Sequence, residues 1–522
     1  MRRLLGPLPL VLALLCAWPA VAPAATGGKF PRSFLWGTAV AGFQTEMGGS
    51  PANRDRGSDW WTWAHDRGNI AERRVSGDLP ERGPGHWRRW RSDVDLAARR
   101  LHSNAFRMSV EWSRIFPRST RGIETGRNVS RRDLRRLDRR ANRSALAHYA
   151  AVIRRARRRG MRVLLTVNHF TLPNWIHDSI AARRALEGRD PDGPLPPMSR
   201  PAGWLDSDTV DEFRKYAAYL AWKLGRQVDI WTPINEPLVV ATNGYANVPG
   251  VIGGFFPPGA FSFTAAITAV LNLERGNAAA YDAIKRWDRH SRVGLVQNLV
   301  AFTPADQSSD ADRRGAVNAD YLFNRLFVNA AVRGRVDRNA NGTIEPSEVR
   351  TRGRRKADFI GVNYYFRGRV QGLPTPLSSR IPVLDFLPQT DYRTPQKPTS
   401  PPCPTECSEF GNEIYPEGLR TVLGTAGRLG LPVIITENGL ADSDDDQRSS
   451  HLIRHLRVLR QAMNDRVARV QGYLHWSLFD NFEWSAGYYP RFGLFRIDSR
   501  LRRRARPSAN VFARIARRNR VP

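Results

Sequence analysis

Two glutamates are the residues of this chain best suited to carry out chemistry. Glu236 lies in Asn235-Glu236-Pro237, and Glu437 lies in Thr436-Glu437-Asn438-Gly439. Each follows a run of apolar, largely β-branched residues, 230–234 and 433–435, of the kind that forms a short buried strand. We therefore expect both carboxyl groups at the C-terminal ends of parallel strands. Two carboxyl groups placed in this way can cleave a glycosidic bond, because one protonates the leaving oxygen while the other attacks the anomeric carbon.

The elements that must position these glutamates recur along the whole chain. Strand-like apolar runs alternate with segments of helical pattern such as 210–224 and 451–463. The runs are residues 34–39, 104–110, 163–170, 229–235, 293–299, 358–364, 433–437 and 471–476. Eight β and α units in alternation predict an α/β protein with a single-domain (β/α)8 TIM barrel and long βα loops. A doubly wound sheet, the alternative, would carry a glycine-rich phosphate loop after the first strand, and the sequence has none.

The N-terminus has the pattern of a secretory signal peptide. Arg2 and Arg3 precede an apolar run over 8–15, and Ala22-Pro23-Ala24 forms a small-residue cleavage site. Residues 1–25 are therefore expected to be the signal peptide and 26–522 the barrel domain of a secreted, extracellular or periplasmic protein. Cys16 follows Leu15 and not a small residue, which disfavours a lipid anchor. No other stretch approaches the ~20 apolar residues that a membrane span requires.

The two cysteines beyond this leader lie close together in Cys403-Pro404-Thr405-Glu406-Cys407. In an oxidising compartment a disulfide between them is the expected outcome. A metal site would need more ligands than the segment offers. The stretch 374–404, rich in Pro, Ser and Thr, is interpreted as a long surface loop closed by this disulfide.

The formal net charge of +32 raises the question of a polyanionic partner. The basic residues of the chain are almost all arginine, and they cluster at 131–159, 350–355 and 500–506. The first of these has the pattern of a solvated helical face without interleaved aromatic residues, so no nucleic-acid partner is expected. Two interpretations of the charge stay open: a general coding preference for arginine, and weak adhesion to acidic cell-wall polymers.

Motifs at nearly every expected strand end resemble those of the family 1 glycoside hydrolases, which are β-glucosidase-like retaining enzymes. The resemblance runs from about residue 30 to residue 498. It rests on Phe34-Leu35-Trp36-Gly37-Thr38-Ala39 with Gln44, Phe106-Arg107-Met108-Ser109, Asn168-His169-Phe170-Thr171-Leu172-Pro173, Asn235-Glu236-Pro237, Asp358-Phe359-Ile360-Gly361-Val362-Asn363-Tyr364-Tyr365, Thr436-Glu437-Asn438-Gly439, Trp476-Ser477-Leu478-Phe479-Asp480-Asn481-Phe482-Glu483-Trp484 and Arg491-Phe492-Gly493.

The resemblance implies a role for each matched residue. Glu437 would be the nucleophile, and Glu236 would act first as acid and then as base. Arg107 would keep Glu437 ionised, Tyr365 would donate a hydrogen bond to it, and Asn235 would hold the 2-hydroxyl of the sugar. Asn363 has a supporting place in its motif. The remaining matched residues would bind the non-reducing sugar with polar groups and ring faces; they are Gln44, His169, Trp476, Glu483, Trp484 and Phe492.

The implied activity is hydrolysis of the terminal non-reducing sugar from small β-glucosides or related β-glycosides, with no cofactor for catalysis. One alternative is transfer of the sugar to an acceptor alcohol from the same site. Another is a non-catalytic carbohydrate-binding relative, which replacement of either glutamate would have favoured. The chain departs from the family pattern at Phe170 and Asn412, where tryptophan is common. Asn412 therefore leaves the preference for the leaving group open.

A second motif lies outside the barrel pattern. Residues 337–348 match the calcium-loop pattern D-x-[DN]-x-[DN]-G-x5-E in full. Asp337, Asn339 and Asn341 would supply side-chain oxygens, Thr343 its carbonyl, and Glu348 both carboxylate oxygens. The alternative is an ordinary Asn-Gly turn in an acidic loop. We expect a structural calcium ion that holds the excursion between the fifth and sixth strands.

Overall fold

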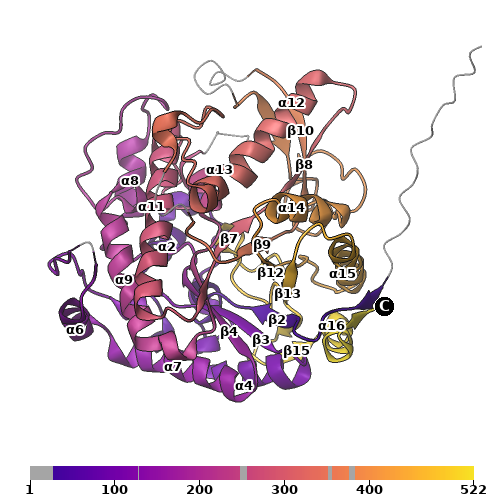
Figure 1. Ribbon diagram of the computed structural model, residues 1–522, viewed down its shortest axis with the longest axis horizontal. Coiled ribbons are helices and arrows are strands. Elements are labelled where there is room, and N and C mark those ends of the chain that lie inside the picture. Colours follow the sequence, from indigo (N-terminus) through magenta and orange to yellow (C-terminus); the bar gives the residue numbers. More distant parts are fainter. Residues whose placement is uncertain (1–26, 127, 247–254, 351–354, 375–382) are drawn as a thin grey trace, which may run out of the picture.

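The computed structural model describes residues 27–126, 128–246, 255–350, 355–374 and 383–522, and the predicted signal peptide lies outside this part of the chain. The strands form an inner ring surrounded by helices (Figure 1). The strands of the ring are β2 (Leu35–Ala39), β3 (Ala105–Ser109), β4 (Arg162–Asn168), β5 (Ile230–Ile234), β6 (Arg292–Val293), β7 (Leu295–Asn298), β9 (Ile360–Asn363), β12 (Val433–Glu437) and β13 (Val470–His475).

The ring is a (β/α)8 barrel, as the sequence predicts. All of its paired strands run parallel, in the order β6-β5-β4-β3-β2-β13-β12-β9-β7. β6 pairs with β5 and β7 with β9, and a bridge between Asn235 and Val296 closes the ring. β6 and β7 are thus two halves of one barrel strand, interrupted at Gly294. A Cβ atom there would lie 2.2 Å from the ring of Phe359, so the close approach requires glycine.

Alternate residues of each strand face opposite sides of the ring. One buried cluster takes a single residue from each of seven neighbouring strand segments and fills the barrel interior: Leu35, Ala105, Leu164, Ile230, Phe359, Ile434 and Leu474. The intervening residues, such as Trp36, Phe106 and Trp231, belong to a larger cluster that packs against the helices. Strands buried on both faces explain why the sequence shows continuous apolar runs rather than alternation.

Most helices of the outer layer connect successive barrel strands. The predicted helices 210–224 and 451–463 are confirmed as α9 (Asp208–Leu224) and α15 (Arg448–Asn464). The longer helices are α4 (His86–Asp95), α6 (Arg131–Arg140), α7 (Arg143–Arg158), α9 (Asp208–Leu224), α11 (Phe263–Trp287), α12 (Asp310–Ala319), α14 (Glu417–Gly427), α15 (Arg448–Asn464) and α16 (Pro507–Arg518). Among the described residues, no helix has the length and apolarity needed to cross a bilayer.

A small three-stranded sheet lies beside the barrel, with α12 next to it (Figure 1). It contains β8 (Ala301–Pro304), β10 (Arg367–Gly372) and β11 (Phe386–Gln389). The prediction of an irregular loop over 374–404 is wrong at β11, which pairs antiparallel with β10 and packs Phe386 against the apolar side of α12. Residues 375–382 of that segment lie outside the described residues. Cys403 and Cys407 form the expected disulfide, which closes a short turn and not the whole segment.

Candidate active site

Glu437 ends β12 with its carboxyl group buried and both of its oxygens engaged. Arg107, an inward-facing residue of β3, forms an ion pair with Oε1 of Glu437. The hydroxyl of Tyr365 donates a 2.6 Å hydrogen bond to Oε2. Burial and the neighbouring charge of Glu437 hold the pKa of Tyr365 well above its ordinary value, so this hydroxyl stays a donor. The surroundings therefore supply positive charge and a fixed orientation to the Glu437 carboxylate.

Glu236 lies at the end of β5 in a different environment. Its backbone has φ 45° and ψ 59°, a left-handed conformation, and α10 (Pro237–Tyr245) begins at the next residue. The amide nitrogen of Glu236 donates to the carbonyl of Val296 across 3.0 Å, and Nδ2 of Asn363 donates to its Oε1 across 2.5 Å. Burial, followed by the charge of Glu437, raises the pKa of Glu236 to about 8. Glu236 therefore holds its proton to higher pH than an ordinary glutamate does.

Asn235 connects the surroundings of the two glutamates. Its Oδ1 accepts hydrogen bonds from Nη2 of Arg107 at 2.6 Å and from Nδ2 of Asn363 at 3.2 Å. Its own Nδ2 is buried and has no partner among the described residues. A buried amide donor of this kind is costly unless something accepts its protons, and a sugar hydroxyl is an acceptor of suitable size.

Gln44 and Glu483 form a second polar group near the glutamates. Nε2 of Gln44 donates to Oδ1 of Asn481 and to the carbonyl of Phe482, both at 3.0 Å, and to Oε2 of Glu483 at 3.4 Å. Oε1 of Gln44 is buried and has no partner in the described part of the chain. Burial and the charge of Glu437 raise the pKa of Glu483 to about 8. Glu236 and Glu483 thus both lie within the electrostatic reach of Glu437.

Aromatic rings form the apolar part of the site. His169 lies face to face with Trp476 and with Trp484, with ring centroids 6.0 Å apart in each pair and interplanar angles of 12° and 14°. Burial and the charge of Arg107 keep the pKa of His169 well below its ordinary value, so its imidazole is neutral. Phe492 contacts the ring of Tyr365 edge to face at 6.0 Å. Flat apolar faces beside polar side chains are typical of a sugar-binding site.

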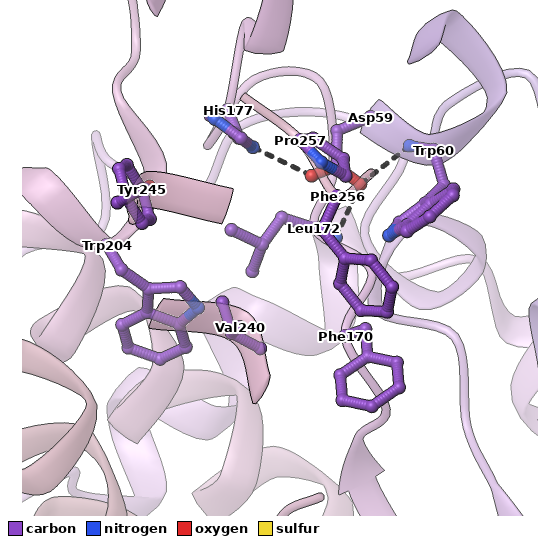
Figure 2. Close-up of a pocket in the computed structure, with 10 residues that line it drawn as sticks. All are labelled: Asp59, Trp60, Phe170, Leu172, His177, Trp204, Val240, Tyr245, Phe256 and Pro257. Atoms are coloured by element: carbon purple, nitrogen blue, oxygen red, sulfur yellow. Dashed lines mark hydrogen bonds and ion pairs between the residues drawn. The ribbon is translucent and has the colours of Figure 1, made fainter. Parts of the chain in front are cut away.

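A small cavity is lined by the residues drawn in Figure 2. Phe170 lines this cavity, and its ring also contacts Trp484 of the site, with centroids 5.1 Å apart. Asp59 accepts hydrogen bonds from Nδ1 of His177 at 2.8 Å and from the amide of Leu172 at 2.9 Å. The cavity has room for about one water molecule. These hydrogen bonds of Asp59 hold the segment that follows β4 in place, and none of the predicted sugar-binding residues lines the cavity.

Sequence reasoning missed one buried group beside the site, Glu111. Its carboxyl oxygens contact residues 43 and 171, which lie next to Gln44 and close to His169. Neither residue type nor spacing in Val110-Glu111-Trp112 sets it apart from an ordinary glutamate before a helix. Burial within an apolar stretch is the one signal that could have pointed to it.

The predicted calcium loop lies in the excursion between β7 and β9, apart from the residues just described. Asp337 and Glu348 are 4% and 6% exposed. Oδ2 of Asp337 accepts from the amide of Gly342 at 2.8 Å and from the hydroxyl of Tyr321 at 2.6 Å. Oδ1 of Asn341 accepts from the amide of Thr343 at 2.8 Å, and Oδ1 of Asn339 from the amide of Asn341 at 3.2 Å. The loop therefore folds around its oxygen-bearing side chains.

Asn412 forms hydrogen bonds with other residues of the surrounding loop. Its Nδ2 donates to the carbonyl of Thr390 at 3.1 Å, and its amide nitrogen donates to Oγ of Ser408 at 3.2 Å.

The structure thus brings together the two glutamates, their supporting residues and the expected sugar-binding residues at the C-terminal ends of the barrel strands. The calcium loop and the disulfide are separate features of the excursions.

A barrel with two buried carboxyl groups at its C-terminal strand ends defines a glycosidase-type site. Comparison with known proteins agrees with this class. The sequence pattern of "Glycosyl hydrolase family 1" matches residues 26–181 and 194–521, and the chain belongs to this family. It is therefore an O-glycosyl hydrolase.

Individual relatives match along almost their whole length. A "Beta-galactosidase" of Pyrococcus woesei is 36% identical over 94% of this chain and 98% of that protein. "Beta-glucosidase A" of Thermotoga maritima is 30% identical over 90% of this chain and 93% of that protein. The crystal structure of the β-glycosidase from the hyperthermophile Thermosphaera aggregans superposes with a TM-score of 0.81 at 36% identity, covering 95% of this chain and 98% of the other.

Proposed function

We propose that this chain is an exported retaining β-glycosidase that removes the terminal non-reducing sugar from β-glucosides or related β-glycosides. The observation that carries the proposal is the contrast between the two glutamates. Glu437 holds an ion pair with Arg107 and a hydrogen bond from Tyr365, whereas Glu236 makes no ion pair with lysine or arginine within the described residues and has its pKa raised to about 8. One carboxyl group is thus suited to attack and the other to donate a proton.

In the first step a carboxylate oxygen of Glu437 attacks the anomeric carbon, and the bond from that carbon to the leaving oxygen breaks. The proton of Glu236 moves to the leaving oxygen, so the aglycone departs as a neutral alcohol. The products are a glycosyl ester on Glu437 and an ionised Glu236. Asn235, whose Nδ2 is without a partner among the described residues, would donate to the 2-hydroxyl as charge develops on the ring.

In the second step the ionised Glu236 takes a proton from water, whose oxygen attacks the anomeric carbon. The ester bond to Glu437 breaks, and both carboxyl groups return to their starting states. Two inversions give a product with the starting anomeric configuration, which requires the carboxyl groups to lie ~5–5.5 Å apart. Proton NMR of the first product formed from an aryl β-glucoside tests this, because β-glucose would appear before mutarotation. An α-anomer as the first product would contradict the retaining mechanism.

The choice of sugar rests on the relatives, whose names include both β-galactosidase and β-glucosidase. We propose that β-glucosides are substrates. β-Galactosides should be assayed alongside them. Transfer of the sugar to an alcohol is the competing activity of the same site. Product analysis in the presence of an added acceptor alcohol separates the two, since alkyl glucoside and free glucose are distinct products.

Export rests on the leader-like residues 1–25. We propose that the mature protein starts near residue 26 and is extracellular or periplasmic, where the disulfide between Cys403 and Cys407 would persist. N-terminal sequencing of the protein recovered from the culture medium or periplasm tests this. Recovery of an intact leader from the cytoplasm would contradict it.

A structural calcium ion in the loop 337–348 is a further part of the proposal. Asp337, Asn339, Asn341, Thr343 and Glu348 offer a set of oxygen ligands, which is the donor type that calcium prefers. The two carboxyl groups are buried and accept hydrogen bonds from backbone amides of the loop, and neither is among the ion pairs of the described residues. A bound cation would balance their charge and hold the loop in place.

Weak adhesion to acidic cell-wall polymers is proposed as a property separate from catalysis. An open groove of about 280 Å³ is lined by Arg100, His102, Asn510, Arg514 and Arg517, without a carboxylate among its lining residues. The two α16 arginines are exposed and three residues apart, so they repel each other. A phosphate-bearing polymer would relieve this repulsion.

The adhesion is tested by binding to teichoic acid at low salt. Replacing Arg514 and Arg517 with glutamine should weaken binding more than the same replacement of Arg131 and Arg135, two exposed arginines of α6. Equal losses in both pairs would mean that only the net charge of the molecule acts, which would overturn the groove as a site.

A further inference from the structure

The carboxyl group of Glu111 lies fully inside the protein, between segments that carry expected sugar-binding residues. Glu111 is 1% exposed and directly precedes α5 (Trp112–Ile115). Gln44 lies on α1 (Gly42–Thr45), and His169 lies in the segment that follows β4. These two segments are far apart in the sequence and approach each other at this carboxyl group.

Each oxygen of Glu111 is bound to one of the two segments. Oε1 accepts a 3.1 Å hydrogen bond from the amide of Phe43, the residue before Gln44. Oε2 accepts a 2.6 Å hydrogen bond from the hydroxyl of Thr171, two residues after His169. Oγ of Ser109 adds a second connection to α1, since it donates to Oε1 of Glu111 at 3.3 Å and accepts from the amide of Gly42 at 2.7 Å.

The backbone of α1 is shaped to admit this carboxyl group. A Cβ atom on Gly42 would lie 2.5 Å from Oε1 of Glu111 and 2.7 Å from its Cγ. Any side chain at position 42 would therefore push the carboxyl group away from Phe43. The segment after β4 is also constrained, because Phe170 has φ 73°, a left-handed conformation that a bulky residue adopts only when its neighbours hold it there.

The groups around Glu111 form a buried charged cluster. Glu46 follows α1 and holds an ion pair with Arg114 of α5 at 2.7 Å, and Asp55 accepts from Oγ of Ser113 at 2.7 Å. The hydroxyl of Tyr149 on α7 accepts from the amide of Glu111, and Tyr216 of α9 lies within electrostatic reach of its carboxyl group. Burial, followed by the charges of Glu46 and Asp55, raises the pKa of Glu111 to about 8.

We propose that Glu111 is a positioning residue of the sugar site, which fixes Gln44 relative to His169 by joining the segments that carry them. This inference rests on the proposed glycosidase function. It assigns Glu111 no contact with substrate. The competing account is that the cluster only stabilises the fold, in which case any disruption of it would affect activity through stability alone.

The two accounts differ in how variants of the cluster affect different substrates. In Glu111→Ala both connections are lost, and kcat/KM for an aryl β-glucoside should fall about a hundredfold, the effect of a displacement of roughly 1 Å at a reacting site. Because Gln44 and His169 are expected to bind ring hydroxyls, this loss should shrink for at least one of the 3-deoxy, 4-deoxy and 6-deoxy glucosides. Glu111→Gln should retain most activity, since its Oε1 can accept from the amide of Phe43 and its Nε2 can donate to Oγ of Thr171, whose hydroxyl then rotates to act as the acceptor.

Two further variants complete the experiment. Asp55→Ala disturbs the same cluster without contacting either segment, so it should lower the melting temperature without selectivity among the deoxy substrates. Thr171→Val removes one connection and leaves Glu111 intact, so it should reproduce part of the substrate-dependent loss of activity seen in Glu111→Ala. If Glu111→Ala does not fold, Thr171→Val takes its place in the comparison with Asp55→Ala.

The outcomes separate the inference from the function on which it rests. An inactive wild-type protein would contradict the proposed function itself. If the wild type is active, the positioning role alone would be overturned by a loss of activity in Glu111→Ala that equals the loss in Asp55→Ala on every substrate. An equal loss in Thr171→Val and Asp55→Ala on every substrate would overturn it too. The positioning role would also be overturned if Glu111→Gln folds but loses as much activity as Glu111→Ala.

Discussion

Asn363 donates a 2.5 Å hydrogen bond from Nδ2 to Oε1 of Glu236, although the two residues end different barrel strands. The orientation of the Asn363 amide is itself fixed, because its Oδ1 accepts from the hydroxyl of Thr436 at 2.7 Å. The position of the expected acid therefore depends on β9 and β12 as well as on its own strand. Asn363 thus links the acid to the strand that carries the expected nucleophile.

Replacing Asn363 with alanine should change both the rate and the pH dependence. Loss of the hydrogen bond lets the Glu236 side chain move, so kcat/KM should fall by about a hundredfold. The same hydrogen bond lowers the pKa of Glu236, so its loss should shift the alkaline limb of the pH profile to higher pH. Asn438→Ala is the control, because Asn438 binds the carbonyl of Tyr364 and not Glu236. An alkaline limb that does not move in Asn363→Ala would contradict this account.

The pH profile of the wild-type protein should be bell-shaped, with its alkaline limb set by Glu236. The first step needs the protonated acid, so kcat/KM should fall as the pH rises through the pKa of about 8. Glu236→Ala should lose this limb. It should also retain far more activity on a dinitrophenyl glucoside than on an alkyl glucoside, because the dinitrophenolate leaves without a proton. A profile unchanged in Glu236→Ala would show that another group is the acid.

Glu111 should make the protein less stable as the pH rises over a defined range. The folded protein keeps the proton of Glu111 up to a pKa of about 8, whereas the unfolded chain releases it near 4.5. The unfolded state therefore gains from deprotonation between these values, and the free energy of unfolding declines across that window. The melting temperature of Glu111→Gln relative to wild type should rise from pH 4.5 to pH 8 and then level off. A difference that does not depend on pH would contradict the assignment.

Calcium removal should destabilise the wild-type protein through the loop 337–348. Chelation should lower the melting temperature of the wild type and not that of Asp337→Ala, which has already lost a principal ligand. Asp310→Ala removes an exposed aspartate that pairs with Arg313, so it should respond to the chelator as the wild type does. Equal shifts in Asp337→Ala and the wild type, or no shift in either, would rule out the calcium site.

The barrel was predictable because a strand buried on both faces leaves a continuous apolar run in the sequence. Runs such as 230–234 and 433–437 locate β5 and β12 closely. Glu437 ends β12 and Glu236 lies two residues beyond β5, so both fall at the rim of the barrel. Asn363 was also accessible, since it ends the apolar run of β9. Motifs at the strand ends were therefore sufficient to predict most residues of the candidate site.

The remainder depends on contacts between distant segments. Glu111 became visible only when residues 43 and 171 came together on its two oxygens, and no pattern in the sequence encodes that meeting. β11 was missed because it forms at the edge offered by β10, with Phe386 covered by α12, and its own residues have little strand character. The break at Gly294 likewise reflects one ring, that of Phe359, packed against the backbone of another strand.

We propose that Glu437 forms a covalent bond to the sugar during the reaction. Incubation with an activated 2-deoxy-2-fluoro-β-glucoside, followed by intact and peptide mass spectrometry, tests it most directly, because the fluorine slows breakdown of the intermediate. We expect a fluoroglucosyl adduct on the peptide that contains Glu437, and no adduct in Glu437→Gln. An adduct on another peptide, or turnover of the glucoside with no adduct from the gluco, galacto and fuco analogues, would contradict it.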